Sequence, residues 1–161
     1  MDDLRNKRVT VMGLGHFGGG IAVAKWLAAQ GAKVLVTDRQ EAGKLKESVD
    51  QLAGVDVEFR LGGHWREDFE RADLVVTSPA VKPTSEFLAA ARAAGVPVTT
   101  EIRLFVERCP AKVIGVTGTK GKSTTTAMLG RTCENVIGKP FALFVVRDDL
   151  TAFLDYLRRC R

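Results

Sequence analysis

Long apolar runs are the first feature that this sequence lacks. Its longest, residues 140–146, has the length of a strand and falls well short of the ~18 residues that a membrane-spanning helix needs. The chain opens with Met1-Asp2-Asp3, which is acidic and is not followed by the apolar core of a secretory signal peptide. We therefore predict a cytoplasmic protein with no membrane partner.

Cysteine is also scarce. The three cysteines, Cys109, Cys133 and Cys160, are far apart and odd in number. They have no metal-ligand spacing with the two histidines, His16 and His64. Reduced thiols without a structural or metal-binding role are the expectation for an intracellular chain.

Aromatic residues make up only 7% of the chain, and its basic residues form no tract. These two absences argue against a nucleic-acid partner, and we expect Trp65 and Phe69 to pack in the core rather than to stack on bases. A net charge of +5 still suits an anionic small ligand such as a nucleotide. The 45% hydrophobic and 27% charged residues are typical of a globular chain, so wholesale disorder is excluded.

What the sequence does contain is a regular alternation of short apolar runs and amphipathic segments. Strands are predicted at residues 9–12, 33–37, 55–61, 74–77 and 96–98. Helices are predicted at residues 17–30, 41–52, 65–71, 84–94 and 101–108. This alternation indicates an α/β fold, in which helices cover both faces of a Rossmann-like parallel sheet.

The pattern restarts after Cys109-Pro110. A strand at 113–116, a glycine-rich turn and a helix at 123–133 are predicted, followed by a strand at 141–146 and a helix at 149–159. We therefore predict a Rossmann-like domain at residues 1–108. Residues 109–161 are predicted to form the beginning of a P-loop ATP-binding domain.

The first glycine-rich turn, residues 13–18, has the pattern G-x-G-x-x-G between a strand and a helix. In this pattern Gly13 permits the tight turn, Gly15 lets a ligand approach the backbone, and Gly18 lets the helix pack on the strand. Asp38, at the end of the second strand, is placed to meet a ribose or a base. Alone, the pattern predicts a nucleotide site, usually for NAD; glycines that serve only the turn are the alternative.

The second glycine-rich turn, with the sequence T-G-T-K-G-K-S-T from residue 117, is the stronger signal. Successive backbone N–H groups in such a turn surround an anion. Lys122 brings a positive charge to the β- and γ-phosphates, and the Ser123 hydroxyl can ligate Mg²⁺, so ATP and Mg²⁺ are the expected cofactors. The strict G-x-x-x-x-G-K spacing fails, because Val116 stands where the first glycine belongs.

This second turn resembles the ATP loop of the Mur ligase family. The G-L-G-x-x-G turn, the strand that ends in Asp38 and the Ser78-Pro79-Ala80 turn extend the resemblance over residues 7–131. Residues 101–105 are similar to the helix that precedes the ATP-binding domain. Within the family, these features favour the member that adds D-glutamate to UDP-N-acetylmuramoyl-L-alanine.

The resemblance implies a Rossmann-like first domain that binds the UDP part of the substrate rather than NAD. It implies that ATP phosphorylates the substrate carboxylate and that the amine of D-glutamate attacks the acyl phosphate, in an amide ligase of peptidoglycan precursor synthesis. The implied substrate-binding residues are Gly13, Gly15, His16, Phe17, Gly18, Asp38, Arg39, Ser78, Pro79 and Ala80. The implied ATP-binding residues are Gly118, Thr119, Lys120, Gly121, Lys122, Ser123 and Thr124, with Lys122 catalytic and Ser123 on the metal ion.

The chain departs from the family in length. Members are longer and have three domains, and the family's metal-binding Glu and His, its modified Lys and its amino-acid site have no counterpart here. We therefore expect an incomplete chain that binds UDP-substrate or ATP without turnover. An NAD-binding Rossmann module remains an alternative that leaves the second turn unexplained; a different P-loop NTPase, or a sister ligase of the folate or muramoyl-alanine type, is another.

Overall fold

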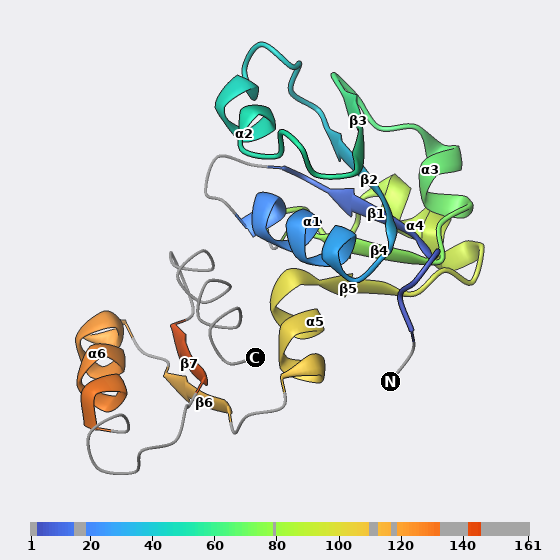
Figure 1. Cartoon of the computed structure of the whole chain (residues 1–161). Helices are drawn as coiled ribbons and strands as arrows, with labels where there is room; N and C mark the ends of the chain where they lie inside the picture. Colours follow the sequence, from blue (N-terminus) through green and yellow to red (C-terminus); the bar gives the residue numbers. More distant parts are fainter. Residues whose placement is uncertain are drawn as a thin grey trace. The chain divides into compact units, whose positions relative to one another are not determined.

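Parallel strands form the core of residues Met1–Leu104, the first of two units in this computed structural model. The structure describes residues 3–14, 19–78, 80–109, 113–116, 119–132 and 142–145. In the first unit, the strands of the described sheet are β1 (Arg8–Met12), β2 (Lys33–Asp38), β3 (Val57–Leu61), β4 (Leu74–Thr77) and β5 (Val98–Thr100). The helices described there are α1 (Gly19–Ala29), α2 (Lys46–Asp50), α3 (Arg66–Glu70) and α4 (Glu86–Ala93), followed by α5 (Glu101–Arg108) (Figure 1).

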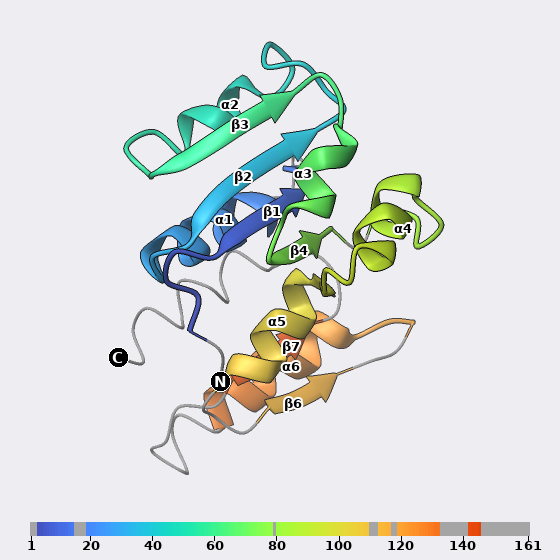
Figure 2. The same cartoon turned by 90° about the vertical axis from the view of Figure 1, so that its right-hand side faces the viewer.

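The strand order is β3-β2-β1-β4-β5, and every neighbouring pair is parallel (Figure 2). The chain builds the sheet outward from β1 to β3 and then crosses back to place β4 on the other side of β1. This order confirms the Rossmann-like fold, and β1 and β4 flank its topological switch point. Ligands of open parallel sheets bind beyond the carboxyl ends of the strands at this point.

Alternating side chains of the strands belong to two apolar layers, one on each face of the sheet. On one face, Val9 and Val11 of β1 pack with a cluster that includes Leu27 of α1 and the leucines flanking α2. On the other face, Val75 of β4 packs with a cluster that includes Phe69 of α3. Two-sided burial explains why the inner strands β1, β2 and β4 are rich in apolar residues on both faces, whereas the edge strand β3 carries the exposed Glu58 and Arg60.

Most predicted elements match those observed to within two residues at each end, and two differences have a clear local cause. The helix expected at 41–52 is confined to Lys46–Asp50, and the residues before it form turns in which Lys44 N–H donates to Glu41 and Leu45 N–H donates to Ala42. Gly43 lies in these turns, where its low helix propensity disfavours an earlier start. The strand expected at 96–98 is observed at Val98–Thr100, after Pro97, which has no N–H to donate to a neighbouring strand.

The second unit, Phe105–Arg161, contains a smaller parallel pair. Strand β6 (Val113–Val116) pairs with β7 (Ala142–Val145), and helix α6 (Lys122–Thr132) lies between them in the sequence. The predicted strands at 113–116 and 141–146 are thus confirmed, whereas the predicted helix at 149–159 lies outside the described residues. The predicted boundary between residues 108 and 109 and the P-loop identity of the second domain stay predictions.

Among the described residues, no helix combines the length and the apolar character that crossing a membrane requires.

Candidate functional site at the carboxyl edge of the sheet

The strand register brings several sequence-predicted residues to one edge of the sheet. Met12 is opposite both Thr37 and Thr77, and Thr77 is opposite Thr100. The residues that end or follow these strands therefore lie in one row at the carboxyl edge: Asp38, Gly13, Ser78 and Glu101. This row spans the switch point between β1 and β4, where a parallel sheet offers its ligand site.

Gly13 forms the tight turn that the first glycine motif predicts. Its φ of +94° lies in the left-handed region, which side-chain-bearing residues rarely adopt. Its N–H donates to the carbonyl of Thr37 at 2.8 Å, and a Cβ at this position would lie 3.4 Å from the Ser78 Cβ. The turn therefore needs glycine for its backbone conformation and lies directly beside the end of β4.

The closest approach of helix α1 to this turn is made by Gly20. A Cβ at Gly20 would lie 2.5 Å from the carbonyl oxygen of Gly13 and 2.6 Å from that of Leu14, distances that a real methyl group essentially never adopts. The motif assigned this packing role to Gly18. Gly15, His16, Phe17 and Gly18 lie outside the described residues. Sequence reasoning missed Gly20, and the only signal for it was the run of three glycines that ends there.

The side chain of Asp38 links the glycine turn to the end of β2 by a hydrogen bond. One carboxylate oxygen accepts the Leu14 N–H at 2.8 Å and the other accepts the Gln40 N–H at 2.9 Å. The side chain is buried, where such charge-assisted bonds are strong. The structure thus gives Asp38 a positioning role that the sequence did not predict. Contact of Asp38 and the adjacent Arg39 with a uridine stays a prediction.

The segment that follows β3 is hydrogen-bonded to the same place. Gly62 N–H donates to the Gln40 carbonyl at 2.9 Å, and Gly63 N–H donates to the Asp38 carbonyl at 3.0 Å. The next residue, His64, forms a hydrogen bond between its Nδ1 and the Oγ1 of Thr37. The sequence gave His64 no metal-ligand spacing and no other role, and this contact could not be predicted because nothing in the local pattern links His64 to β2.

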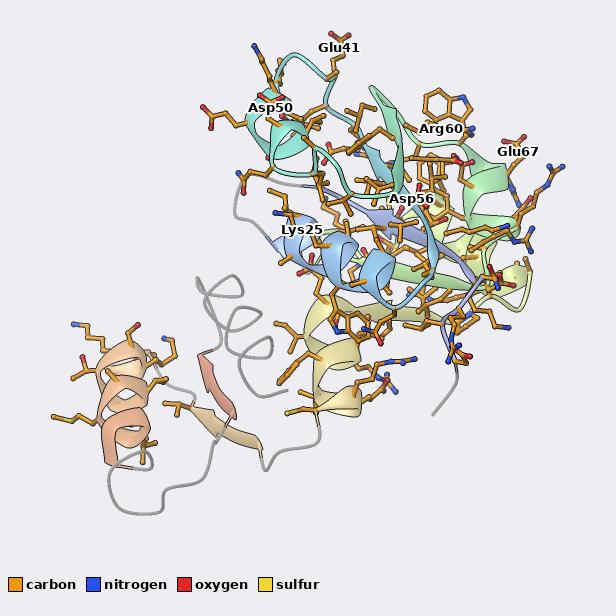
Figure 3. All side chains as sticks on the ribbon, in the orientation of Figure 1. Lys25, Glu41, Asp50, Asp56, Arg60 and Glu67 are labelled. Atoms are coloured by element: carbon orange, nitrogen blue, oxygen red, sulfur yellow. The ribbon has the colours of Figure 1, made fainter. Side chains whose placement is uncertain are left out.

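Trp65 and Phe69 have different environments. Phe69 is fully buried, as predicted, but Trp65 is 44% exposed, so the prediction that it packs in the core is wrong. The guanidinium of Arg60 lies 5.3 Å from the centre of the Trp65 ring and also bonds to Asp68 at 2.6 Å. Figure 3 labels Arg60, which lies on β3. The contact of its cation with the indole ring stabilises Trp65 at the surface.

Ser78 begins the turn that leads from β4 toward α4. Its N–H donates to the Met12 carbonyl at 3.1 Å, and its hydroxyl accepts the Ala80 N–H at 3.4 Å. Ser78 and Ala80 therefore lie beside the glycine turn, as the resemblance implies, while Pro79 lies outside the described residues. Their contact with a substrate stays a prediction.

Glu101 ends the row at the carboxyl edge. It follows β5 directly, opens α5 and is only 7% exposed. Burial raises the pKa of its carboxyl group to about 7. The sequence indicated a helix here but gave no sign that its first carboxylate is buried.

The second glycine-rich turn ends at helix α6, which begins at Lys122. Gly121 has a φ of +76°, and its carbonyl accepts the Thr125 N–H at 2.9 Å. The N-terminus of such a helix presents backbone N–H groups and a partial positive charge, which suit a phosphate. Gly118 lies outside the described residues. Lys122 is half-buried, and the other five predicted ATP ligands are exposed: Thr119, Lys120, Gly121, Ser123 and Thr124.

These features fit a nucleotide with its metal ion. The second unit offers a helix N-terminus, an ammonium at Lys122 and an exposed hydroxyl at Ser123, the hard oxygen donor that Mg²⁺ prefers. Among the described residues, no cluster of three or more His, Cys, Asp or Glu side chains could hold a metal ion by itself.

A protein-family profile described as "Mur ligase MurD-like, N-terminal domain" matches residues 7–100. The UDP-N-acetylmuramoylalanine--D-glutamate ligase of Roseiflexus sp. (strain RS-1) is 52% identical over 127 residues, which are 79% of this chain and 27% of that protein. The enzyme of the same name from Treponema pallidum (strain Nichols) is 39% identical over 157 residues, or 96% of this chain and 29% of that protein. The chain thus spans little more than a quarter of the length of these relatives.

Solved structures of related ligases have the same fold. A pseudomurein peptide ligase type C from Methanothermus fervidus matches with a TM-score of 0.52 and 27% identity, over 77% of this chain and 25% of that one. The UDP-N-acetylmuramate:L-alanyl-gamma-D-glutamyl-meso-diaminopimelate ligase from Neisseria meningitides matches with a TM-score of 0.56 and 25% identity, over 80% of this chain and 40% of that one.

Proposed function

The chain belongs to the MurD-like Mur ligases, and from this we propose that it provides the substrate-binding part of an ATP-dependent amide ligase. The reaction would join D-glutamate to UDP-N-acetylmuramoyl-L-alanine, through an acyl phosphate, in peptidoglycan precursor synthesis. The observation that carries the proposal is the family match over residues 7–100, which covers all five strands of the sheet that builds the carboxyl-edge row.

In this proposal the UDP part of the substrate binds beyond the carboxyl ends of β1 and β4. The glycine turn and the N-terminus of α1 face the diphosphate, because backbone N–H groups at a helix N-terminus favour an anion. Asp38 and Arg39 lie toward the uridine, and the turn from Ser78 to Ala80 lies along the same edge. The bond that the Asp38 carboxylate accepts from the Leu14 N–H supports this arrangement, since it holds the glycine turn in place before any ligand arrives.

ATP and Mg²⁺ are proposed to bind at the start of α6. Mg²⁺ there would supply charge neutralisation for the transferring phosphoryl group. Lys122 would stabilise the same charge, and the Ser123 hydroxyl would be a metal ligand. The left-handed Gly121 supports this assignment, because it lets the backbone turn tightly just before the helix begins.

The first prediction tests the UDP site. Replacing Gly15 by valine is expected to weaken binding of UDP-N-acetylmuramoyl-L-alanine by about 100-fold or more, because a branched side chain would block the close approach of the diphosphate to the backbone. Isothermal titration calorimetry measures the affinity, and circular dichroism checks that the variant is folded. Gly43→Val is the matched control, since Gly43 has open space around it. Binding of NAD by the unmodified chain, with no binding of the UDP compound, would overturn the proposal in favour of an NAD-binding module.

The second prediction tests the ATP site. Lys122→Ala is expected to weaken Mg²⁺-ATP binding by about 10- to 100-fold, the range that corresponds to the loss of a charge-assisted hydrogen bond. Affinity for the UDP compound should stay unchanged in the same variant. Lys25→Ala, which removes an ammonium from α1, serves as the control for a general loss of positive charge. Equal ATP affinity in all three proteins would show that the second glycine-rich turn is not the ATP site.

A further inference from the structure

His64 connects two parts of the first unit that are far apart in the sequence. Its Nδ1 forms a hydrogen bond with Thr37 at the end of β2. Its ring stands edge-on to Phe69 of α3, with centroids 5.9 Å apart, and to Phe87 of α4, with centroids 5.2 Å apart. One imidazole therefore links the carboxyl edge of the sheet with two helices that cover its second face.

The contact with Thr37 belongs to a short chain of hydrogen bonds that ends at the glycine turn. Thr37 is fully buried, and its carbonyl accepts the Gly13 N–H. The neighbouring Asp38 accepts the Gly63 N–H on its carbonyl and the Leu14 N–H on its carboxylate. A change in the position of His64 would therefore alter the position of the glycine turn, through the hydrogen bonds of Thr37 and Asp38.

We propose that His64 is a positioning residue for nucleotide binding, which acts through Thr37 to hold the ends of β2 and β3 where Asp38 can fasten the glycine turn. This inference rests on the proposed UDP-binding function. His64 is far in the sequence from the glycine motif at residues 13–18. In this proposal it affects ligand binding without touching the ligand.

The protonation state of His64 gives this role a signature that simple packing lacks. Burial lowers the pKa of the imidazole below its ordinary value, and the Arg39 guanidinium lowers it further. The carboxylates of Asp38 and Asp68 act in the opposite direction and are outweighed. The other side chains packed against the ring, Phe69 and Phe87, carry no charge. The imidazole is therefore neutral at neutral pH and takes up a proton only in acid.

Protonation would disturb the contact with Thr37 in two ways. In the imidazolium both ring nitrogens carry hydrogen, so Nδ1 can only donate, and the Thr37 hydroxyl must accept this hydrogen rather than donate its own. A second positive charge also appears beside Arg39, at the end of β2. We therefore expect the affinity for the UDP compound to fall as the solution is made acidic.

The experiment compares the pH dependence of binding in four proteins. Calorimetric titrations with UDP-N-acetylmuramoyl-L-alanine are made from about pH 8 to about pH 5, because the lowered pKa of His64 places its titration below that of an ordinary histidine. This ligand is suitable because its diphosphate is esterified at both ends and does not titrate in that range. The unmodified chain is compared with His64→Gln, His64→Ala and Phe87→Leu, each at a temperature where circular dichroism shows it to be folded.

Relative to His64→Gln, the unmodified chain should lose affinity about 5- to 10-fold from the upper to the lower pH. His64→Gln keeps a side chain that can bond to Thr37 but cannot titrate, so its affinity should lie within about twofold of the unmodified chain at the upper pH. Any pH dependence that remains in this variant comes from other groups, such as Glu101 at the same edge of the sheet. His64→Ala should bind about 10-fold more weakly at every pH. Phe87→Leu removes a ring contact but keeps the imidazole, so its pH dependence should persist.

The outcomes separate this inference from the function on which it rests. If the affinity of His64→Gln for the UDP compound changes with pH in the same way as that of the unmodified chain, His64 does not have the proposed role. The same conclusion follows if His64→Ala binds as well as the unmodified chain. If the unmodified chain does not bind the UDP compound at any pH, the proposed function itself fails, and the inference fails with it.

Discussion

Gly20→Ala is expected to lower the free energy of unfolding by about 3 kcal/mol, the upper part of the usual range for overpacking. The added methyl group would lie 2.5 Å from the Gly13 carbonyl oxygen, 2.6 Å from the Leu14 carbonyl oxygen and 2.8 Å from the Leu14 Cα. All three are backbone atoms, so no flexible side chain can move aside, and helix α1 would have to shift away from β1. Urea denaturation followed by circular dichroism measures the loss.

Gly43→Ala is the matched control for this substitution. Gly43 has no atom within 4 Å of an added Cβ, and its φ lies outside the left-handed region. Alanine there should be neutral or should raise the free energy of unfolding by about 0.4–1 kcal/mol, because it restricts the unfolded chain. Similar stability in the Gly20 and Gly43 variants would show that α1 does not pack on the glycine turn as described.

The same substitution should also affect ligand binding in the fraction that remains folded. Gly20 sets how closely the start of α1 approaches the turn at Gly13, and the proposed diphosphate site lies where the two meet. A helix displaced from β1 would carry its N–H groups away from the turn. In Gly20→Ala, a weaker affinity for the UDP compound is therefore expected together with the loss of stability, whereas Gly43→Ala should bind normally.

The parallel sheet was predictable from the sequence because its strands are short apolar runs closed by turn residues. Helix α5 was predicted at its observed bounds, Glu101–Arg108. Elements whose ends depend on tertiary contacts were less predictable. Strand β5 begins at Val98, and the preceding Pro97 accepts the Val75 N–H of β4 on its carbonyl, a contact between distant parts of the sequence. The spacing of apolar residues in the sequence indicates whether a segment is a helix or a strand. It does not indicate the long-range hydrogen bonds that decide where the element begins.

The candidate site was predictable to the same degree. The family resemblance named Asp38 and Ser78, which the strand register brings to the same edge of the sheet. The glycine motif correctly placed Gly13 in a tight turn. It did not indicate that Asp38 bonds to Leu14, 24 residues away in the sequence, or that Thr37 bonds to His64, 27 residues away. Such contacts depend on which strands become neighbours, and a one-dimensional spacing rule contains no information about side-chain partners across a sheet.

The other large effect is expected at Glu101, which is buried at the end of β5. Because its pKa rises from 4.5 to about 7 on folding, the folded protein binds its proton more tightly than the unfolded chain does. The stabilisation from this group is complete below about pH 4.5 and is lost progressively as the pH rises to about 7, a change of about 3 kcal/mol. Above that pH the carboxylate is ionised in both states and its burial opposes folding.

Glu101→Gln should therefore stabilise the protein at about pH 8, by as much as about 3 kcal/mol, and should have little effect at about pH 4.5. An ionised carboxylate in the first turn of α5 gains about 0.3–1 kcal/mol from the helix dipole, which is too little to offset the burial cost. Urea denaturation at a series of pH values measures both effects. Glu107→Gln is the control, because Glu107 is exposed on the same helix, and its stability should follow the pH dependence of the unmodified chain. If Glu101→Gln instead keeps that pH dependence, the carboxyl group is ionised in the folded protein throughout, which requires a cation or a hydrogen-bond donor beside it at the carboxyl edge.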